Sequence, residues 1–447
     1  MVLALAACGP DSIVLDTGLE SSSGAATEAT STPTGETQSD PAESESGDEA
    51  NTGSEGDDET ETGEEESPPP EYEADGCEVE VLWSHRSESG QEFDRLTLLE
   101  YAGPGRFVVA GGAQADSDRD FVPDTSASLV LGVEDGETSW TQLGQWQEST
   151  SGPVVNSLLL ADNGDVYTIA NGSPSFFAPQ RLEAFSPTGE ALFVAETEDS
   201  HWDAMAWLEG ELLVLGRTAP GLDEDVNTTT IPLSFARFDP QLELLAVDQA
   251  GYDDELWTLL EPSLLVEDDR ISVGAYNYDD GVGVVVEFDA SGQQIWLSAN
   301  GDQVGASRAI ARLGGGALVS AGTLESMNLF LQGLSGWTGA GASTFTWQPG
   351  PDDIELGGFN DIEPLADGGF VAVGIHGSSA SLRRFDAEGQ QLSACNLSRA
   401  GVEASEFFTA AANFQAVEIG PQGQIYALLY DPYPELPAEN TIVELTL

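Results

Sequence analysis

Short apolar runs flanked by glycine recur along the chain after residue 76. Successive runs begin roughly 45–60 residues apart, and this regular spacing indicates a repeated unit. The runs alternate or are continuously apolar, which predicts strands that pack on both faces, and helical periodicity is absent. The runs are residues 105–112, 164–172, 210–217, 269–276, 315–322, 368–374 and 423–430.

A second repeated pattern predicts a hairpin. A strand ends in Phe-Asp or a close variant, a turn with glycine follows, and the next strand carries an apolar or aromatic residue. Asp and Gly suit a short turn in which the glycine adopts a positive φ. The segments with this pattern are residues 182–193, 235–246, 285–296 and 382–392.

Together the two patterns predict an all-β fold, a seven-bladed β-propeller of four-stranded antiparallel sheets. We name the strands of each blade a to d, from the central axis outward. Residues 283–289 and 293–298 are then strands c and d of one blade, and 307–313 and 317–323 are strands a and b of the next. Six or eight blades, or a pair of smaller β domains, are the alternatives.

The two ends of the repeat region each carry an incomplete blade. Residues 76–85 form an outer strand without its partners, and residues 438–447 form a strand c without its d. We expect these ends to pair and close the ring, because closure removes an exposed sheet edge. The repeats resemble those of seven-bladed propellers of secreted bacterial proteins over most of residues 76–447, which implies the fold and no particular activity.

Charge narrows the range of partners. The chain has 447 residues, and its 13 basic residues, all arginine, stand against 79 acidic ones, for a formal net charge of −66. Such a chain repels polyanions, so nucleic acid and an anionic bilayer surface are not expected as partners. Basic partners or divalent cations fit the charge, while a solubilising surface is the simpler explanation.

The first eight residues, MVLALAAC, resemble the signal and lipobox of bacterial lipoproteins. The resemblance implies cleavage before Cys8, acylation of Cys8 with palmitate-type chains, and sorting to the outer membrane, on its periplasmic side or at the cell surface. A basic region normally precedes such a signal, so we expect the true start to lie upstream. No run approaches the ~20 apolar residues of a membrane span, which leaves the lipid as the expected anchor.

Residues 9–75 are predicted to form a disordered acidic tether between this anchor and the propeller at 76–447. The segment is rich in Ser, Thr, Gly and Glu, and its apolar residues are too sparse to offset the entropy lost on ordering. Its like charges repel one another and extend the chain. We expect a monomer held away from the bilayer.

The long b–c and d–a connections predict the binding face. Strand directions alternate, so these connections emerge on one face, while the short a–b and c–d turns emerge on the other. Long irregular loops on a rigid scaffold commonly carry binding sites. The candidate ligand-binding residues around the channel mouth are His201, Trp202, Tyr252, Asp253, Asp254, Trp257 and His376, and loop packing is the alternative explanation for each.

Catalytic motifs are missing from the sequence. The three histidines form no HExxH motif, and neither a GxSxG elbow nor zinc spacing occurs. A binding or scaffold module for protein or glycan is therefore the preferred hypothesis. The alternatives are a carbohydrate-active hydrolase or lyase that uses loop carboxylates or His201, and an envelope assembly factor without a ligand of its own.

One acidic loop predicts a possible calcium site. Residues 115–124 read ADSDRDFVPD and resemble the calcium loops of thrombospondin-type repeats, except that Phe121 replaces a glycine. Alternating carboxylates suit Ca²⁺, which takes 6–8 oxygen ligands. The ligands would be Asp116, Asp118, Asp120 and Asp124, with a solvated loop as the simpler alternative; no other cofactor is expected.

Two cysteines remain once Cys8 is lipidated. An even pair in an exported domain suggests a disulfide between Cys77 and Cys395. The predicted strand register places them near opposite faces of neighbouring blades, whereas a bridge needs Cα atoms within ~7 Å. The bond therefore requires the segment before the first strand to fold back.

Overall fold

The computed structural model describes most of the chain after residue 70. The described residues are 71–86, 92–115, 125–144, 147–148, 155–171, 180–197, 200–218, 233–249, 263–267, 269–277, 282–299, 304–326, 329–350, 356–400, 412–432 and 439–447. Cys8, the expected tether before residue 71, and the calcium candidates Asp116, Asp118, Asp120 and Asp124 lie outside them.

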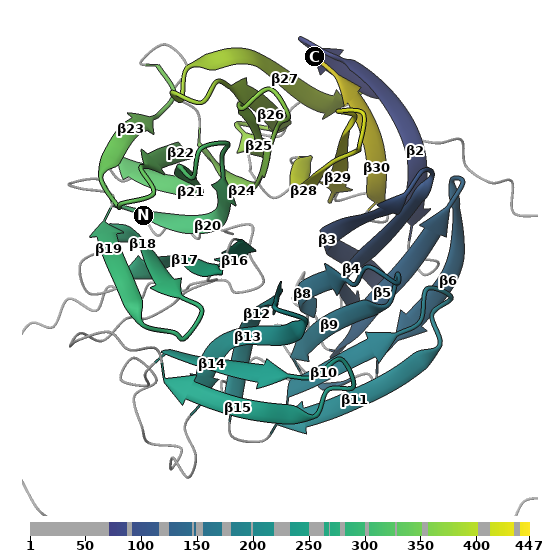
Figure 1. Cartoon of the computed structure of the whole chain (residues 1–447). Coiled ribbons are helices and arrows are strands. Elements are labelled where there is room, and N and C mark those ends of the chain that lie inside the picture. The colour runs from purple at the N-terminus through teal and green to yellow at the C-terminus, as the bar shows by residue number, and fades with distance from the viewer. Residues whose placement is uncertain are drawn as a thin grey trace, which may run out of the picture. The chain divides into compact units, whose positions relative to one another are not determined.

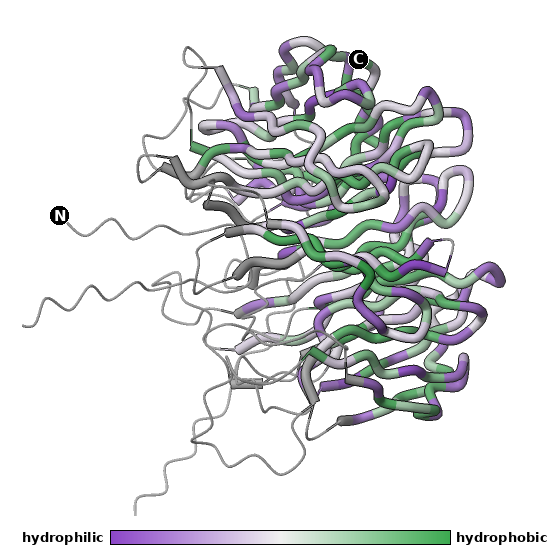
Figure 2. Tube along the Cα trace, turned by 60° about the vertical axis from the view of Figure 1, so that its left-hand side comes forward, coloured by the Kyte–Doolittle hydropathy of each residue, from purple (hydrophilic) through white to green (hydrophobic). Residues whose placement is uncertain are grey.

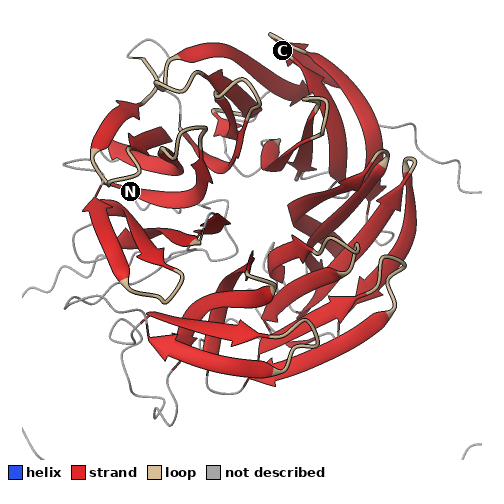
Figure 3. Ribbon diagram, viewed as in Figure 1, coloured by secondary structure: helices blue, strands red, loops and turns tan. Residues whose placement is uncertain are grey.

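Seven antiparallel sheets surround one axis, with strand a of each sheet innermost (Figure 1). The described residues form strands and turns, with no helix among them (Figure 3). The structure therefore confirms the predicted seven-bladed propeller of four-stranded sheets. We number the blades 1 to 7 in chain order from the first strand a.

The first four blades follow one another without interruption along the chain. Blade 1 contains β3 (Glu92–Gly103), β4 (Arg106–Ala115), β5 (Thr125–Glu134) and β6 (Glu137–Leu143), with β7 (Gln147–Glu148) paired to β5. Blade 2 contains β8 (Val155–Leu160), β9 (Val166–Asn171), β10 (Gln180–Phe185) and β11 (Ala191–Thr197). Blade 3 contains β12 (Ser200–Leu208), β13 (Glu211–Thr218), β14 (Leu233–Phe238) and β15 (Leu244–Gln249). Blade 4 contains β16 (Ser263–Glu267), β17 (Arg270–Asn277), β18 (Val282–Asp289) and β19 (Gln294–Ala299).

The last two blades recruit strands from the start of the folded region. Blade 5 contains β20 (Val304–Arg312), β21 (Leu318–Ser326), β22 (Leu329–Trp337) and β23 (Ser343–Trp347). Blade 6 contains β24 (Gly357–Pro364), β25 (Phe370–His376), β26 (Ser379–Phe385) and β27 (Gln391–Arg399), with β1 (Tyr72–Asp75) as a fifth strand. Blade 7 contains β28 (Asn413–Ile419), β29 (Ile425–Asp431), β30 (Glu439–Thr446) and β2 (Glu78–Arg86).

Apolar side chains fill the spaces between neighbouring blades. Phe235 of blade 3 and Phe288 of blade 4 meet edge to face with their ring centroids 5.2 Å apart, and both are buried. The apolar strand residues and polar turns are visible along the chain trace in Figure 2. Because each sheet packs on both faces, its middle strands are nearly continuously apolar, as the sequence predicted.

The c–d turns follow the predicted Asp–Gly chemistry. In the turn after β18, Asp289 Oδ1 accepts hydrogen bonds from the backbone N–H groups of Ser291 and Gln293, at 2.9 and 3.0 Å. Gly292 in this turn has a φ of 80°, which glycine adopts without steric cost. In the blade 3 turn, Leu242 occupies the same position with a φ of 62°.

Aromatic residues on outer strands lie against the c–d turns of the following blade. Trp296 Nε1 donates to the Gly339 carbonyl oxygen at 3.3 Å, and a Cβ at Gly341 would come within 2.6 Å of the Trp296 ring. Trp140 makes the equivalent contact, with a 3.1 Å bond to the Pro187 carbonyl oxygen. Trp296 and Trp140 therefore each seal the joint between their own blade and the next.

The ring closes through the predicted strand pairing. β2 lies beside β30 in antiparallel register from Glu78 opposite Thr446 to Arg86 opposite Glu439, as Figure 1 shows at the outer edge of blade 7. This pairing completes the last sheet. The N-terminal segment thus supplies the strand d that the C-terminal blade lacks.

A second attachment ties the same N-terminal segment to blade 6. β1 pairs with β27, from Tyr72 opposite Arg399 to Asp75 opposite Asn396. Cys77 follows directly and is joined to Cys395 in a disulfide, with the Cα atoms 5.3 Å apart. The segment before β2 does fold back, which is the arrangement that a bond between these cysteines requires.

Candidate functional site

The innermost strands a share a local irregularity. All but β16 contain a β-bulge, in which one extra residue is not matched by the neighbouring strand b, and β3 has a second bulge near its end, at Ala102. β16 pairs with β17 without a shift over its described length. Bulges re-aim a side chain and are frequent beside functional sites. The extra residues of the first bulge in each strand, which we call the bulge ring, are Thr97, Asn156, Asp203, Arg308, Asn360 and Gln415.

Every member of the bulge ring is polar. Each lies between the start and the middle of its strand, toward the face from which the long d–a connections arrive. We call this the loop face. Several members are hydrogen-bonded from blade to blade: Arg308 Nη1 donates to Asn360 Oδ1 at 2.9 Å, and Asn360 Nδ2 donates to the Phe414 carbonyl oxygen at 2.7 Å.

The blade 3 part of the ring contains a histidine–aspartate pair. His201 Nε2 lies 3.0 Å from Asp203 Oδ1, and the two side chains are 20% and 11% exposed. Buried Gln180 of blade 2 holds this strand in place, because its amide bonds both the backbone N–H and the carbonyl oxygen of Trp202. The Gln180 Nε2 atom also lies 3.2 Å from His201 Nδ1.

These contacts define what His201 can do chemically. A neutral imidazole has one N–H donor and one acceptor nitrogen. The Gln180 amide N–H faces Nδ1, and in the neutral tautomer whose Nδ1 accepts this bond, the Nε2–H group donates a hydrogen bond to Asp203 Oδ1. Both ring nitrogens are therefore engaged, which disfavours His201 as a general base. Asp203 Oδ2 is buried and has no hydrogen-bond partner within the described part of the chain.

A related arrangement stands at the start of blade 1. His85 Nε2 lies 2.6 Å from Asp94 Oδ2. The Asn440 side chain of blade 7 accepts from Leu96 N at 3.0 Å and donates to the Asp94 carbonyl oxygen at 2.8 Å. Here too a buried amide on a strand c clamps the backbone of the next strand a. Both histidine–carboxylate pairs therefore lie at the loop face, fixed by a neighbouring blade.

The structure places the predicted ligand-binding residues in three different situations. His201 is partly accessible at the loop face, whereas Trp202 is 1% exposed and packs edge to face with Phe238 at 6.4 Å. His376 ends β25 at the same face and is 6% exposed. Tyr252, Asp253, Asp254 and Trp257 lie outside the described residues.

Four carboxylates lie on three adjacent innermost strands, closer to the short turns. Glu100, Glu363 and Glu418 each follow a bulge residue by the same interval, on β3, β24 and β28, and Asp361 directly follows the bulge residue of β24. Burial raises the pKa of Glu100 to about 8, and the Asp361 carboxylate adds to the rise. Burial also raises the pKa of Asp361 to about 6, against the N–H groups of Val417 and Ile362, which favour its charged form.

The two remaining carboxylates of this group titrate in the same direction. Burial is the main cause of a strongly raised pKa at both Glu363 and Glu418, and the neighbouring acidic groups add to it. Among the residues that the structure describes, no set of His, Cys, Asp and Glu side chains is arranged to hold a metal ion. The calcium loop at 115–124 stays a prediction of the sequence.

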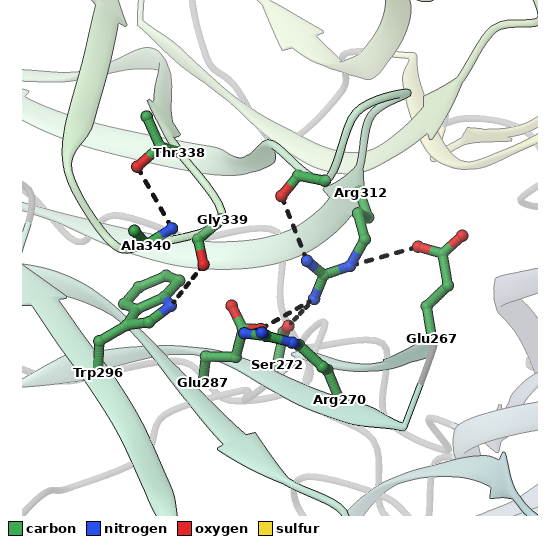
Figure 4. A network of polar contacts seen from close by, with 10 residues as sticks. Glu267, Arg270, Ser272, Glu287, Trp296, Arg312, Thr338, Gly339 and Ala340 are labelled. Carbon is green, nitrogen blue, oxygen red and sulfur yellow. Dashed lines mark hydrogen bonds and ion pairs between the residues drawn. The ribbon is translucent and has the colours of Figure 1, made fainter.

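A dense polar network joins blades 4 and 5 at the opposite, short-turn face (Figure 4). Arg312 Nη2 donates to Ser272 Oγ at 2.8 Å, and Arg312 Nε lies 3.3 Å from Glu267 Oε2. Fully buried Glu287 accepts from Arg270 Nη1 at 2.6 Å. These contacts hold two blades together, and they leave buried Glu287 Oε2 and Arg312 Nε without a hydrogen-bond partner among the described residues.

Comparisons with known proteins return structural likeness only. No family model matches the chain, and no curated protein matches it. Similar solved structures include the polysaccharide lyase Uly1, with 8% identity, a TM-score of 0.48 and coverage of 78% of this chain and 89% of that one. Sqt1 from Chaetomium thermophilum has 11% identity, a TM-score of 0.47 and coverage of 82% and 99%.

A third similar structure is the β-propeller domain of the Trilobed protease from Pyrococcus furiosus, with 10% identity, a TM-score of 0.44 and coverage of 79% and 95%. Likeness at this level carries no argument about activity. The strand pairing itself defines the chain as a seven-bladed β-propeller. None of the described residues form a helix long and apolar enough to cross a membrane.

Proposed function

We propose that this protein is a membrane-anchored extracytoplasmic binding or scaffold module that holds a protein or glycan partner at its loop face. The observation that carries the proposal is the bulge ring. Six polar side chains lie on innermost strands at equivalent places, where a plain strand would need no irregularity. Asp203 is one of these side chains, and it is paired with His201 at the loop face.

A catalytic role has weaker support. In a hydrolase or lyase of this kind a histidine or carboxylate would need a free atom directed at the substrate. His201 has both ring nitrogens engaged, and the carboxylates with raised pKa values lie toward the short turns. The preferred function is therefore recognition, without turnover.

Binding to a glycan array and co-precipitation from envelope extracts test the proposal with the full chain. The ring variant Thr97→Ala/Asn156→Ala/Asp203→Ala should lose the captured partner. A control variant, Thr188→Ala/Gln241→Ala/Glu388→Ala, changes exposed residues of the c–d turns and should keep it. Equal binding by both variants would count against the loop face, and turnover of a captured polysaccharide would favour the enzymatic alternative.

The anchor is tested separately. We propose that Cys8 is acylated and that residues 9–70 act as a tether to the outer membrane, since Tyr72–Asp75 form β1 of the propeller. Metabolic labelling with a fatty-acid analogue should mark the wild type, and Cys8→Ser should abolish the label and release the protein to the soluble fraction. Membrane association that persists in Cys8→Ser would contradict a lipid anchor.

A further inference from the structure

The outermost strands carry the exposed apolar residues of the propeller. All ten large hydrophobic side chains that are exposed in the described part of the chain lie on a strand d. Eight of them belong to three consecutive blades. They are Leu192, Phe193 and Val194 on β11, Leu244, Leu245 and Val247 on β15, and Ile295 and Leu297 on β19, which we call the outer strip.

The strip is unusual for sheet edges. Proteins normally protect an edge strand with lysine, proline or charged side chains, because unpaired backbone groups there accept another strand. β11, β15 and β19 each end their sheet, with no further strand paired outside them in the described structure. Val194, Leu244 and Leu245 are each at least half exposed, at 50%, 56% and 52%. These edges therefore combine open hydrogen-bonding groups with apolar side chains.

The molecule itself shows how such an edge is occupied. In blade 6 the equivalent strand β27 accepts β1 as an antiparallel fifth strand, from Tyr72 opposite Arg399 to Asp75 opposite Asn396. The outer edge of a blade in this propeller therefore has a geometry that accepts an added strand. Strand addition of this kind is a recurrent way of binding an extended peptide.

Charge selects among the possible occupants. Exposed Glu190 precedes β11 and exposed Glu243 precedes β15, while Glu196 and Asp248 lie within these strands. Arg181 lies 3.1 Å from Glu196 and Arg237 lies 4.0 Å from Asp248, so the arginines offset only part of this acidity. A second copy of the chain, with its formal net charge of −66, would be repelled.

We propose that β11, β15 and β19 form a strand-docking surface for an extended apolar segment of another protein, flanked by Lys or Arg. The segment would add to a blade edge as β1 adds to β27. Its apolar side chains would cover the outer-strip residues of that blade. Its basic residues would face the acidic flanks. This surface is separate from the loop face, so the two sites can be tested independently.

Selection from a phage-displayed library of short random peptides, panned on the full-length protein, tests the proposal. Enriched peptides should alternate apolar residues, lack proline and carry terminal Lys or Arg, and they should slow amide hydrogen exchange in β11, β15 or β19. The variant Val194→Arg/Leu245→Arg/Leu297→Arg should weaken their binding by about tenfold or more, since it adds like charge to the strip.

A matched control adds the same charge elsewhere. Thr141→Arg/Thr344→Arg/Thr346→Arg changes exposed residues on β6 and β23, the outer strands of blades 1 and 5, and should bind the peptides as the wild type does. The proposal is overturned if no peptide is enriched, if the enriched peptides are acidic or proline-rich, or if the strip variant binds them as tightly as the control. Circular dichroism of both variants verifies that each is folded.

Discussion

Cys77 and Cys395 are bonded to each other although 318 residues separate them along the chain. Cys77 lies between β1 and β2, and Cys395 lies in β27 of blade 6. The bond therefore links the two places where the N-terminal segment is attached, the fifth strand of blade 6 and the outer strand of blade 7. The ring is therefore closed by the hydrogen bonds between β2 and β30, and the disulfide next to β2 adds a covalent link to blade 6.

Removing this bond should destabilise the closed ring. The disulfide restricts the conformations of the unfolded chain, and replacing Cys77 with serine removes this restriction. The loss of a native disulfide typically costs about 2–5 kcal/mol of unfolding free energy. Urea unfolding of Cys77→Ser under non-reducing conditions should show a lower midpoint than the wild type. The reduced wild type should match the variant. Unchanged midpoints in both samples would contradict a stabilising role for the bond.

The contact between Trp296 and Gly341 predicts that glycine is required at position 341 for two reasons. One is the positive φ of the backbone, and the other is the close approach of the tryptophan ring. Gly341 has a φ of 81°, and an added Cβ would lie 2.6 Å from the Trp296 ring. Gly423 has a φ of 85°, but its Cβ would meet nothing within 4 Å. Gly423→Ala should therefore cost only the backbone strain, about 1–2 kcal/mol. Gly341→Ala should cost more, because the ring must also move.

Thermal unfolding of the two glycine variants measures this difference. The melting temperature of Gly341→Ala should fall below that of Gly423→Ala, and the fluorescence of Trp296 should report the displaced ring. Equal melting temperatures would mean that the tryptophan does not seal the joint between blades 4 and 5.

Carboxylates with raised pKa values predict that the propeller is more stable in mild acid than in mild base. The folded protein keeps a proton on Glu100 up to about pH 8, while the unfolded chain releases it near 4.5. Between these pH values the folded state binds more protons, so the free energy of unfolding decreases as pH rises. Asp361, with a pKa of about 6, contributes in the same direction at lower pH.

A neutral amide at position 100 should remove much of this dependence. Glu100→Gln should stabilise the protein at pH 8 by about 1–2 kcal/mol, given about 1.4 kcal/mol per pKa unit and partial exposure of the side chain. At pH 4 or below it should have little effect, because Glu100 is then protonated in both states. Glu137→Gln, at an exposed position, is the control. A stability that rises with pH in the wild type and in Glu100→Gln alike would contradict the expectation.

The repeated patterns predict the blades because every strand must bury side chains on both faces. The hairpin around Asp289 and Gly292 and the pairing of residues 78–86 with the C-terminal strand follow from local chemistry and counting of strands. β1 could not be foreseen, since YEAD carries one aromatic residue and three small or acidic ones. Its pairing with β27 is decided by long-range register.

The bulge ring cannot be predicted from the sequence for a similar reason. Strand propensity describes which residues suit a pleated sheet, but a bulge is a mismatch between two strands and appears only when both are aligned. The available signal is a polar residue directly after a phenylalanine, as at Asn360 in GGFNDIEP and Gln415 in NFQAVEI. Trp202 illustrates the opposite difficulty, because a tryptophan beside a loop can belong to the loop or to the core.

The amide of Gln180 predicts how firmly neighbouring blades hold the loop face. Its side chain bonds both backbone groups of Trp202 and is 2% exposed. Gln180→Met keeps the length of the side chain but leaves these buried groups without partners, so we expect a loss of about 1–3 kcal/mol in unfolding free energy. Gln142→Met removes a single, half-buried bond to the Gly189 carbonyl oxygen and should cost less.

Hydrogen exchange distinguishes a local from a global effect of Gln180→Met. If the clamp positions His201 and Asp203, the amide of Trp202 should exchange faster in this variant, and partner binding at the loop face should weaken. The Gln142→Met control, on the outer strand β6, should leave both unchanged. Faster exchange spread evenly over all blades would show that Gln180 supports the whole fold and does not specifically position the histidine–aspartate pair.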